Sequence, residues 1–362
     1  MIIGTRDTLT GAADNRPVRH HRRVELDAHR GELTAYCYRM TGSYQDAEDL
    51  VQETLLRAWK ARERYDPARS AVRTWLYRIA TNACLTALEG RARRPLPSGL
   101  GAPCDDPGAP LAPAPEVPWL QPFPDGRHDH DTRAELRLAW VAAVQLLPAR
   151  QRAVLILREV LGFTAAEVAE QLDTTAAAVN SALQRARSTV AGVAPGAVRE
   201  PEDPGQRAAV DRYLAAFEAA DVPALVGLLA EDAVLEMPPL ALWFRGTDAY
   251  RRFMARIFRQ RGADWRTRPA RANGQPAFAA YAFDGAAHRL HSLQVLELAG
   301  GFVVRNTVFT DPATLRTFEL PETIRDFPRG GDESGPRRRY VPVRAAGTAP
   351  RPRTDRGRTD AR

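Results

Sequence analysis

The chain has 362 residues and a formal net charge of +7, from 51 lysines and arginines against 44 acidic residues. Lys60 is the only lysine, so arginine supplies nearly all the positive charge, and such a chain attracts polyanions. No apolar run approaches the ~20 residues of a membrane span and no signal-peptide core is visible. We therefore expect a soluble, cytoplasmic protein that does not itself bind a membrane, so that any membrane coupling depends on a partner. The three cysteines are too few and too scattered for a disulfide framework or a zinc site. We interpret Cys37, Cys84 and Cys104 as structural or incidental thiols.

After a flexible N-terminus at residues 1–24, two helices are predicted. Residues 26–40 carry apolar side chains at helical spacing, namely Leu33, Tyr36, Cys37 and Met40. Ser43, with Asp46 three residues later, begins the second helix, over residues 46–59. Its apolar face is opposed by an acidic edge formed by Asp46, Asp49 and Glu53, which in isolation is an ordinary solvated surface.

Residues 65–94 are expected to form a turn, a helix capped by Ser70 and an arginine-rich end. Trp75, Leu76 and Ile79 are predicted to face inward, and Arg73, Asn82 and Thr86 outward. An aromatic platform beside cations suits unstacked bases. This combination is offered by Tyr65, Asp66, Arg69, Trp75, Tyr77 and Asn82, although burial in the core is the favoured interpretation of Trp75. The terminal Arg91, Arg93 and Arg94 suit phosphate contacts.

Residues 95–130 are rich in proline and lack any helical or strand period. We expect an extended, semi-stiff spacer, whose acidic residues keep it from adhering to DNA. The apolar Trp119 and Phe123 leave two alternatives open: docking on a partner protein or on the C-terminal part of the same chain.

Residues 147–186 have the pattern of a helix-turn-helix. Pro148 suits the first position of a helix, Gly162 its end, and Thr164 with Glu167 a capping box on the next helix. The last helix has an apolar stripe at Val179, Leu183 and Ala186. The opposite face can reach base edges and phosphates in a major groove through Asn180, Ser181, Gln184, Arg185 and Arg187. A plain helical hairpin is the alternative.

Residues 207–320 are long enough for a further domain. Helices are expected at 207–221, 222–230 and about 247–260, and strands at 265–272, 277–283, 288–298 and 301–310. Helices followed by a curved antiparallel sheet make an α+β unit. Residues 329–362 are rich in arginine, proline and glycine and are expected to be a disordered basic tail.

Together, DAEDLVQETLLRAW, WLYRIATNACL and the helix-turn-helix resemble extracytoplasmic-function (ECF) sigma factors of the sigma-70 family. The resemblance assigns residues 25–94 to region 2 and 131–195 to region 4. It implies that core RNA polymerase is a partner, through the clamp helices of its β′ subunit and its β flap. The residues that it assigns to polymerase binding are Asp46, Asp49, Gln52 and Glu53. An anti-sigma factor or other regulatory protein is a further partner that the family suggests.

Promoter DNA is the second partner that the resemblance implies. The −10 element would be contacted by Tyr65, Asp66, Arg69, Ser70, Arg73, Asn82, Thr86, Arg91, Arg93 and Arg94. The −35 element would be contacted by Thr174, Thr175, Asn180, Ser181, Gln184, Arg185 and Arg187. Many relatives have lysine or arginine where this chain has Asn180 and Ala182, so we expect weaker phosphate anchoring there.

The order of elements in the C-terminal part, with WFRG and NGQPAF, resembles the cone-shaped SnoaL-like fold found in the sigma-G and sigma-J-like subgroup. Both enzymes and non-catalytic binding domains use that fold. Pocket-lining candidates are Met237, Trp243, Phe253, Asn273, His291 and Phe309. Asp232 and Asp248 suit caps and Asn273 suits a turn, so no acid and base pair is evident and we expect a regulatory domain, not an enzyme.

The sequence therefore predicts a multidomain protein with two all-α sigma domains and a C-terminal α+β cone. Its predicted function is promoter-specific transcription initiation with core polymerase, without a metal or cofactor. Two alternatives remain: a helix-turn-helix regulator that acts without polymerase, and a DNA-binding protein fused to a small-molecule-binding or isomerase-like domain.

Overall fold

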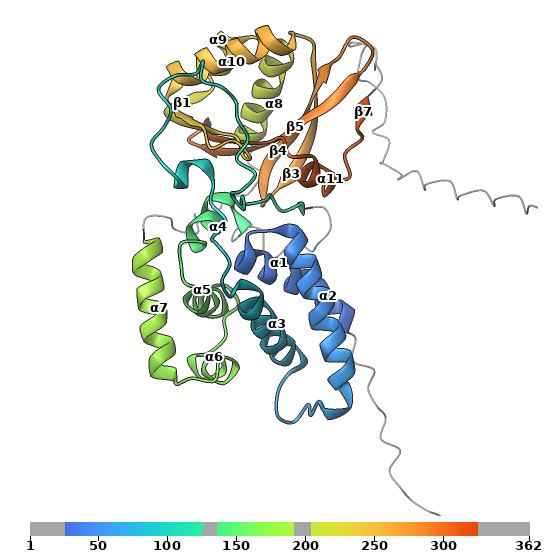
Figure 1. Cartoon of the computed structure of the whole chain (residues 1–362), viewed down its shortest axis with the longest axis vertical. Helices are drawn as coiled ribbons and strands as arrows, with labels where there is room; N and C mark the ends of the chain where they lie inside the picture. Colours follow the sequence, from blue (N-terminus) through green and yellow to red (C-terminus); the bar gives the residue numbers. More distant parts are fainter. Residues whose placement is uncertain (1–25, 126–135, 192–203, 325–362) are drawn as a thin grey trace, which may run out of the picture. The chain divides into compact units, whose positions relative to one another are not determined.

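The computed structural model describes residues 26–125, 136–191 and 204–324. We refer to residues 26–94 as the first helical module, 136–191 as the second helical module and 204–324 as the C-terminal module (Figure 1). The predicted N-terminus at 1–24, linker residues 126–130 and the basic tail at 329–362 lie outside the described residues. Among the described residues, no helix is both long enough and apolar enough to cross a membrane.

The first helical module contains three helices, which are α1 (Arg30–Thr41), α2 (Tyr44–Ala61) and α3 (Val72–Leu88). Two 3-10 turns, Leu26–His29 and Arg62–Arg64, precede α1 and follow α2. The predicted stripe on α1 is confirmed, since all four of its side chains are fully buried. Ser43 caps α2 by accepting a hydrogen bond from the Asp46 amide, as expected. Between them, Gly42 has φ +70°, and a Cβ there would lie 2.8 Å from Leu120, so only glycine fits.

The second helical module contains four helices, which are α4 (Leu138–Val144), α5 (Ala149–Leu155), α6 (Ala165–Gln171) and α7 (Ala176–Val190). A π-helical turn, Ile156–Val160, extends α5. The capping box of Thr164 and Glu167 on α6 is confirmed, and Gly162 lies in the left-handed region where the preceding helix has ended. Pro148 is the residue before α5 and not its first residue.

The C-terminal module places four helices and a curved sheet in one unit. Its helices are α8 (Pro204–Glu218), α9 (Val222–Val226), α10 (Thr247–Arg261) and the short α11 (Pro312–Arg316). Its strands are β1 (Leu229–Glu236), β2 (Trp243–Arg245), β3 (Trp265–Ala272), β4 (Gln275–Phe283), β5 (His288–Ala299), β6 (Phe302–Phe309) and β7 (Thr323–Ile324). The order is β2-β1-β6-β5-β4-β3, antiparallel except for the β1 and β6 pair, with β7 beside β5.

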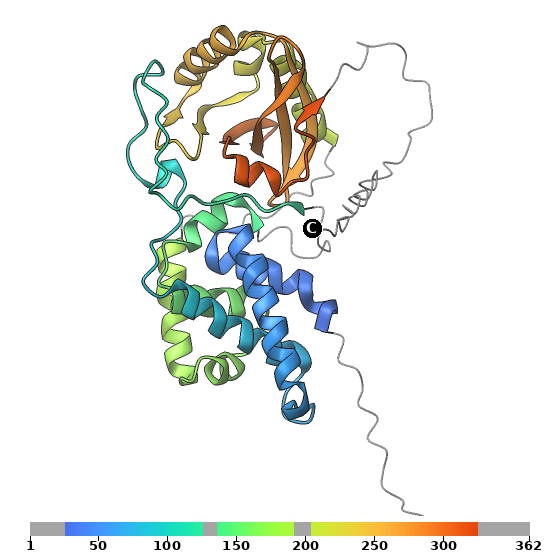
Figure 2. The same ribbon diagram turned by 45° about the vertical axis from the view of Figure 1, so that its right-hand side comes forward.

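The four predicted strands from residue 265 onward are confirmed, but the sheet begins earlier than expected. Residues 229–236 form β1, so the short helix predicted to reach residue 230 ends at Val226. Asp232 is exposed on this strand and caps no helix. The sequence did not predict β1, because the second half of this strand is buried on both faces and its residues do not alternate between buried and exposed. In Figure 2 the strands curve around the space that α8 and α10 occupy.

The linker, described for residues 95–125, contradicts the prediction of a free spacer. The Cys104 amide donates to the Trp243 carbonyl at 2.7 Å, and the Ala114 amide donates to the Pro239 carbonyl at 2.9 Å. Arg256 donates to the carbonyls of Pro107 and Ala109. The linker is extended, as expected, but its backbone is satisfied by the C-terminal module; Figure 2 shows it, in cyan, beside that module.

Two buried clusters form the core. One fills the space between α8, α10 and one face of the sheet, with Phe217, Phe253, Trp265 and Phe278 among its members. The other joins both helical modules, linker residues Leu120 and Phe123, and the opposite face of the sheet through Leu293 and Phe309. Residues distant in sequence therefore share one core, which brings the candidate interfaces into contact with each other.

Candidate nucleic-acid and polymerase interfaces

The loop before α3 presents an aromatic pair. Tyr65 and Trp75 stack with ring centroids 4.7 Å apart and an interplanar angle of 29°. The Tyr65 hydroxyl donates to the Ser70 carbonyl at 2.8 Å, and the Asp66 carboxylate accepts the Ala68 amide at 2.9 Å. Ser70 is not the helix cap, because α3 starts after Ala71 without a side-chain cap. Trp75 is half-buried, between the core position favoured from the sequence and an open platform.

The polar face of α3 is divided. Asn82 and Thr86 are exposed, as predicted. Tyr77, expected beside them, is fully buried and donates to Glu32 at 3.1 Å. Arg73 is directed inward rather than outward, with its Nε 2.9 Å from Glu32 and its guanidinium over the ring of Phe163. The prediction failed there because the partners come from α1 and from the second helical module.

Burial opposes the ionisation of Glu32, but hydrogen bonds from His29 and Arg73 outweigh it and hold the pKa of this carboxyl below its ordinary value. Glu32 is therefore a charged anchor for Arg73 at neutral pH. Arg73 is held in place by an internal ion pair, which any base or phosphate would have to replace.

The arginines after α3 contact the acidic edge of α2. Asp46 lies 3.2 Å from Arg91 and 2.9 Å from Arg94. Arg93 is exposed and donates to the Gly99 carbonyl. Two predicted phosphate-binding residues are thus paired with a predicted polymerase-binding residue within the same module. Arg91 and Arg94 therefore contact a carboxylate, whereas Arg93 contacts a backbone carbonyl.

The rest of the acidic edge is open. Asp49, Gln52 and Glu53 are all exposed on α2, where Glu53 pairs with Arg57 at 2.6 Å. Sequence reasoning missed two large apolar side chains on the same face, Leu56 and Trp59, which are 51% and 55% exposed. Their helical spacing from Gln52 and Glu53 was the available signal. The result is a mixed acidic and apolar strip, typical of a protein-binding surface.

The predicted division of α7 into a buried stripe and an exposed polar face is confirmed. Val179, Leu183 and Ala186 are buried, whereas the five predicted reading residues, Asn180, Ser181, Gln184, Arg185 and Arg187, are exposed. Thr175 accepts a hydrogen bond from the Ala178 amide and is the N-cap, and Thr174 is exposed beside it. Arg187 pairs with Glu159 at 2.6 Å, both largely in solvent. A polar helix face with a capped N-terminus is therefore available to DNA.

The second helical module packs on the first through a buried guanidinium. Arg152 of α5 is 4% exposed and donates to the carbonyls of Val144, Leu147 and Met40 and to both oxygens of Gln145. Burial lowers its pKa to about 10, so it remains charged at neutral pH. Gln145 in turn donates to the Arg39 carbonyl at 3.1 Å. Carbonyls of α1 therefore bind side chains of the second module directly.

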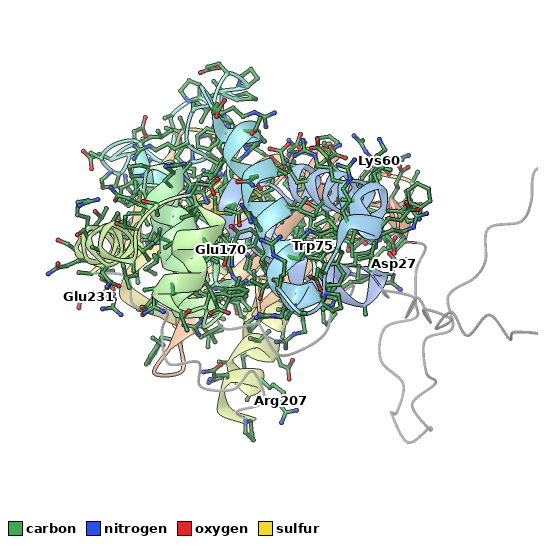
Figure 3. The ribbon with its side chains drawn as sticks, turned by 90° about the horizontal axis from the view of Figure 1, so that it is seen from below. Asp27, Lys60, Trp75, Glu170, Arg207 and Glu231 are labelled. Atoms are coloured by element: carbon green, nitrogen blue, oxygen red, sulfur yellow. The ribbon has the colours of Figure 1, made fainter. Side chains whose placement is uncertain are left out.

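A second contact between these modules lies at α3 and α6. Phe163 packs edge-on against Tyr77 with centroids 5.4 Å apart. Arg78 lies 3.5 Å from Asp173 and 3.9 Å from Glu170. Figure 3 labels Trp75 on α3 and Glu170 on the neighbouring α6. Part of α3 is therefore covered by the second helical module.

The β3 to β4 turn joins all parts of the described chain. Asn273, at φ +57° as expected for a turn, exchanges two hydrogen bonds with the linker residue Phe123 at 2.8 and 2.9 Å. Its side-chain amide also donates to the Tyr38 hydroxyl and the Leu136 carbonyl. The Gly274 amide donates to both carboxylate oxygens of Asp125. Asn273 is fully buried among these partners.

The six predicted pocket residues do not gather. Met237 and Phe253 belong to the cluster beneath α8 and α10, Phe309 belongs to the cluster on the opposite sheet face, and the Trp243 indole donates to Gly101 of the linker. His291 packs edge-on against Trp265, and burial lowers its pKa to about 4. The residues were grouped from size and hydropathy, which do not tell one face of the sheet from the other.

The polar centre beneath α8 and α10 was not predicted. The hydroxyls of Tyr213 and Tyr250 are hydrogen bonded to each other, and the Asn306 amide donates to both and to Gln294 at 2.8 Å. Burial raises the pKa of both tyrosines, so they stay neutral. The described residues contain no group of three or more histidine, cysteine, aspartate or glutamate side chains that could hold a metal ion.

The modules match three family descriptions: residues 26–94 match sigma-70 region 2, residues 137–190 match sigma-70 region 4, and residues 210–306 match the SnoaL-like domain. We use these names for the modules from here on. The fold agrees with the crystal structure of the Mycobacterium tuberculosis ECF sigma factor SigJ, with a TM-score of 0.56 and 24% identity over 81% of this chain and 97% of that one.

Two curated relatives extend the likeness in sequence. ECF RNA polymerase sigma factor SigJ of M. tuberculosis (strain ATCC 25618 / H37Rv) is 28% identical over 253 residues, which are 66% of this chain and 73% of that one. ECF RNA polymerase sigma factor SigG of the same strain is 48% identical over 321 residues, 84% of this chain and 86% of that one. The chain therefore belongs to the ECF sigma factors of the sigma-70 family.

Proposed function

We propose that this sigma factor binds core RNA polymerase through α2, reads and opens a −10 element through region 2 and reads a −35 element through α7. The exposed polar face of α7, opposite a fully packed apolar stripe, carries this proposal. Such a face is exposed for entry into a major groove, where Arg187 would exchange its ion pair with Glu159 of the same module for a phosphate. The proposed place of action is the cytoplasm, where the polymerase works.

The polymerase contact is assigned to the exposed strip of α2. Asp49 and Glu53 supply charge for a basic helix pair of β′, and Leu56 with Trp59 supplies apolar area that stays in water in the free chain. Exposed tryptophans are enriched among residues that dominate binding energy at interfaces. Asp46 is assigned a lesser role, because Arg91 and Arg94 already neutralise it.

The −10 contact is assigned to the loop at residues 65–70 and to the exposed part of α3. The Tyr65 and Trp75 stack offers an aromatic surface for an unstacked base, with Arg69 exposed beside it. Asn82 and Thr86 are accessible on the same helix. Arg73 is available to DNA only when Glu32 and Phe163 release it.

The SnoaL-like domain is proposed to regulate by holding the two DNA-reading regions together. Elements that lie 25 base pairs apart are separated by about 85 Å along straight DNA, at about 3.4 Å per base pair. Region 2 and region 4 are instead in hydrogen-bond contact through Arg152 and Met40, and Asn273 binds region 2, the linker and the start of region 4 together. Promoter binding by both regions therefore requires these contacts to open.

We propose a regulatory and not a catalytic role for this domain. The side chains that were predicted to line one pocket are divided between the two faces of the sheet. The buried hydroxyls of Tyr213 and Tyr250 in this domain are hydrogen bonded to each other. We call the arrangement in which region 4 contacts region 2 the closed arrangement. An anti-sigma factor or other protein that stabilises it would act in the same direction as Asn273.

Reconstitution with core polymerase on a promoter library tests the proposed function. The substitutions Asp49→Lys and Glu53→Lys together should weaken core binding and transcription while the circular dichroism spectrum stays unchanged. The matched control is the pair Glu231→Lys and Asp232→Lys, which reverses two exposed charges on β1. Equal core affinity for the two double variants would refute the docking assignment, and the absence of promoter-specific transcripts from the unmodified chain would refute the function.

A further inference from the structure

Two cysteines of region 2 face each other across its core. Cys37 lies on α1 and Cys84 on α3, with their sulfur atoms 3.6 Å apart and both side chains fully buried. Cys104, in the linker, is partly exposed and contacts the Asp106 carbonyl instead. The first two thiols are therefore a pair by geometry, although they are 47 positions apart in sequence.

The distance between the sulfurs permits a bond without a large movement. A disulfide has an S–S length of about 2.05 Å, so closure requires an approach of about 1.5 Å, which side-chain rotation and a small helix shift can supply. The two helices pack directly on each other, and Tyr36 next to Cys37 is hydrogen bonded to Thr81, one turn before Cys84. The backbone on both sides of the pair is thus already held at bonding range.

The closed arrangement protects this pair. The hydrogen bond with Cys37 and burial raise the pKa of the Cys84 thiol, and a buried thiol in an apolar core is inert. Arg152 of region 4 lies near enough for its charge to act on Cys84, and its guanidinium binds the Met40 carbonyl one turn after Cys37. Departure of region 4 would remove this cover from region 2.

We propose that Cys37 and Cys84 are a redox modification site, which a hydroperoxide oxidises to a disulfide linking α1 to α3 when region 4 has left region 2. One thiolate attacks the peroxide O–O bond, forms a sulfenic acid and releases water or an alcohol. The second thiol then displaces water from the sulfenic acid. Two thiols lose two electrons and two protons in total, and the hydroperoxide is reduced.

The timing of the reaction rests on the proposed opening of region 4, whereas the pairing of the thiols does not. In the closed chain we expect slow oxidation, and in the complex with core polymerase and promoter DNA we expect oxidation to be several-fold faster. The bond would tie α3, which carries the exposed Asn82 and Thr86, to α1.

The test uses the full chain with the single substitution Cys104→Ser, so that only the pair remains. The chain is treated with hydrogen peroxide alone and in complex with core polymerase and promoter DNA, and is then digested without reductant for mass spectrometry. We expect a Cys37 to Cys84 cross-linked peptide pair that is about 2 Da lighter than the sum of its thiol forms and is restored by dithiothreitol. Adding Cys37→Ala should abolish the cross-link, with thermal melting as a check of folding.

Several results would overturn the proposal. Free thiols at both positions after peroxide treatment in the promoter complex would exclude the disulfide, as would linkage only between different chains. Equal rates in the free chain and the promoter complex would exclude protection by region 4. If the cross-link is absent while core binding and promoter-specific transcription are intact, the redox site fails and the proposed function stands. If the untreated chain does not transcribe but the cross-link forms, the proposed function fails and the pairing of the thiols stands.

Discussion

The two helices proposed to read DNA, α3 and α7, differ in how many contacts their polar faces make with the rest of the chain. On α7 the candidate reading residues Asn180 and Gln184 face solvent. On α3 the basic first turns are occupied, because Arg73 binds Glu32 and Arg78 lies beside Asp173 of region 4. In the proposed function, the −35-reading face of α7 is exposed in the free chain except for the pair of Arg187 with Glu159, whereas full use of the −10-reading face of α3 requires region 4 to move away.

The substitution Arg152→Met should weaken the contact between region 4 and region 2 most strongly. It removes the donor to several buried carbonyls, including that of Met40, and each unsatisfied buried carbonyl costs about 1–3 kcal/mol. We expect the free energy of unfolding to fall by about 3 kcal/mol, measured by chemical denaturation, and proteolysis between the regions to become faster. Arg150→Met, at an exposed position of the same helix, is the control, and equal stability of the two variants would contradict the role of Arg152.

Asn273→Gly should loosen the contacts among the SnoaL-like domain, the linker and region 2. Glycine tolerates the positive φ of this turn, so the effect reports the lost side-chain hydrogen bonds. We expect a loss of about 2 kcal/mol and faster hydrogen exchange at the Phe123 amide, which donates to Asn273.

If the domain regulates as proposed, Asn273→Gly should also raise transcription at limiting sigma concentration. Arg289→Ala, at an exposed position of β5, provides a comparison within the same domain. Unchanged exchange at Phe123 together with unchanged transcription would refute the holding role of Asn273.

Asn180→Ala or Gln184→Ala should change how the exposed face of α7 discriminates among −35 sequences. Each base contact that is lost should change discrimination among −35 sequences by about 1–3 kcal/mol, without changing thermal stability. Arg187→Ala should weaken binding to all sequences and reduce its salt dependence, because a phosphate contact positions but does not specify. Selection from a randomised −35 library measures both effects; equal losses on all sequences for all three variants would mean that α7 does not read bases.

The smallest effect concerns the Glu32 and Arg73 pair. Because the pKa of Glu32 is held below its ordinary value, its contribution to stability is present above the unfolded pKa and is lost as pH falls through the folded one. Both side chains are partly exposed, so we expect less than about 1 kcal/mol. Comparing the free energy of unfolding of the unmodified chain and Glu32→Gln between about pH 6 and pH 3 should show the two converging at the acid end. A constant difference would contradict the assignment.

Local pattern was enough to predict most elements and the face of α7. The capping box at Thr164, the stripe through Val179 and Leu183, and the strands from Trp265 onward depend on neighbours in sequence, so helical and strand periods reveal them. Most of what depends on distant partners was not predictable, although docking of Phe123 on the C-terminal part of the chain was one of the two alternatives left open. Arg73 faces inward because of Glu32 and Phe163, and the linker is fixed by backbone hydrogen bonds to the SnoaL-like domain.

The position of Asn273 shows this limit most clearly. Its turn conformation follows from the Asn-Gly pair, but its burial follows from Tyr38, Phe123 and Leu136, which no local pattern connects to it. The exposed Leu56 and Trp59 were available in the sequence, at helical spacing from the acidic edge of α2.

The central claim is that region 4 lies on α3 in the free chain and leaves it on the promoter. Energy transfer between dyes at Thr86→Cys on α3 and Ser188→Cys on α7 tests it directly, in a chain that carries Cys104→Ser and keeps the fully buried Cys37 and Cys84. We expect high transfer in the free chain and low transfer in the complex with core polymerase and promoter DNA. Low transfer in the free chain, or the same high transfer in a transcribing complex, would contradict it.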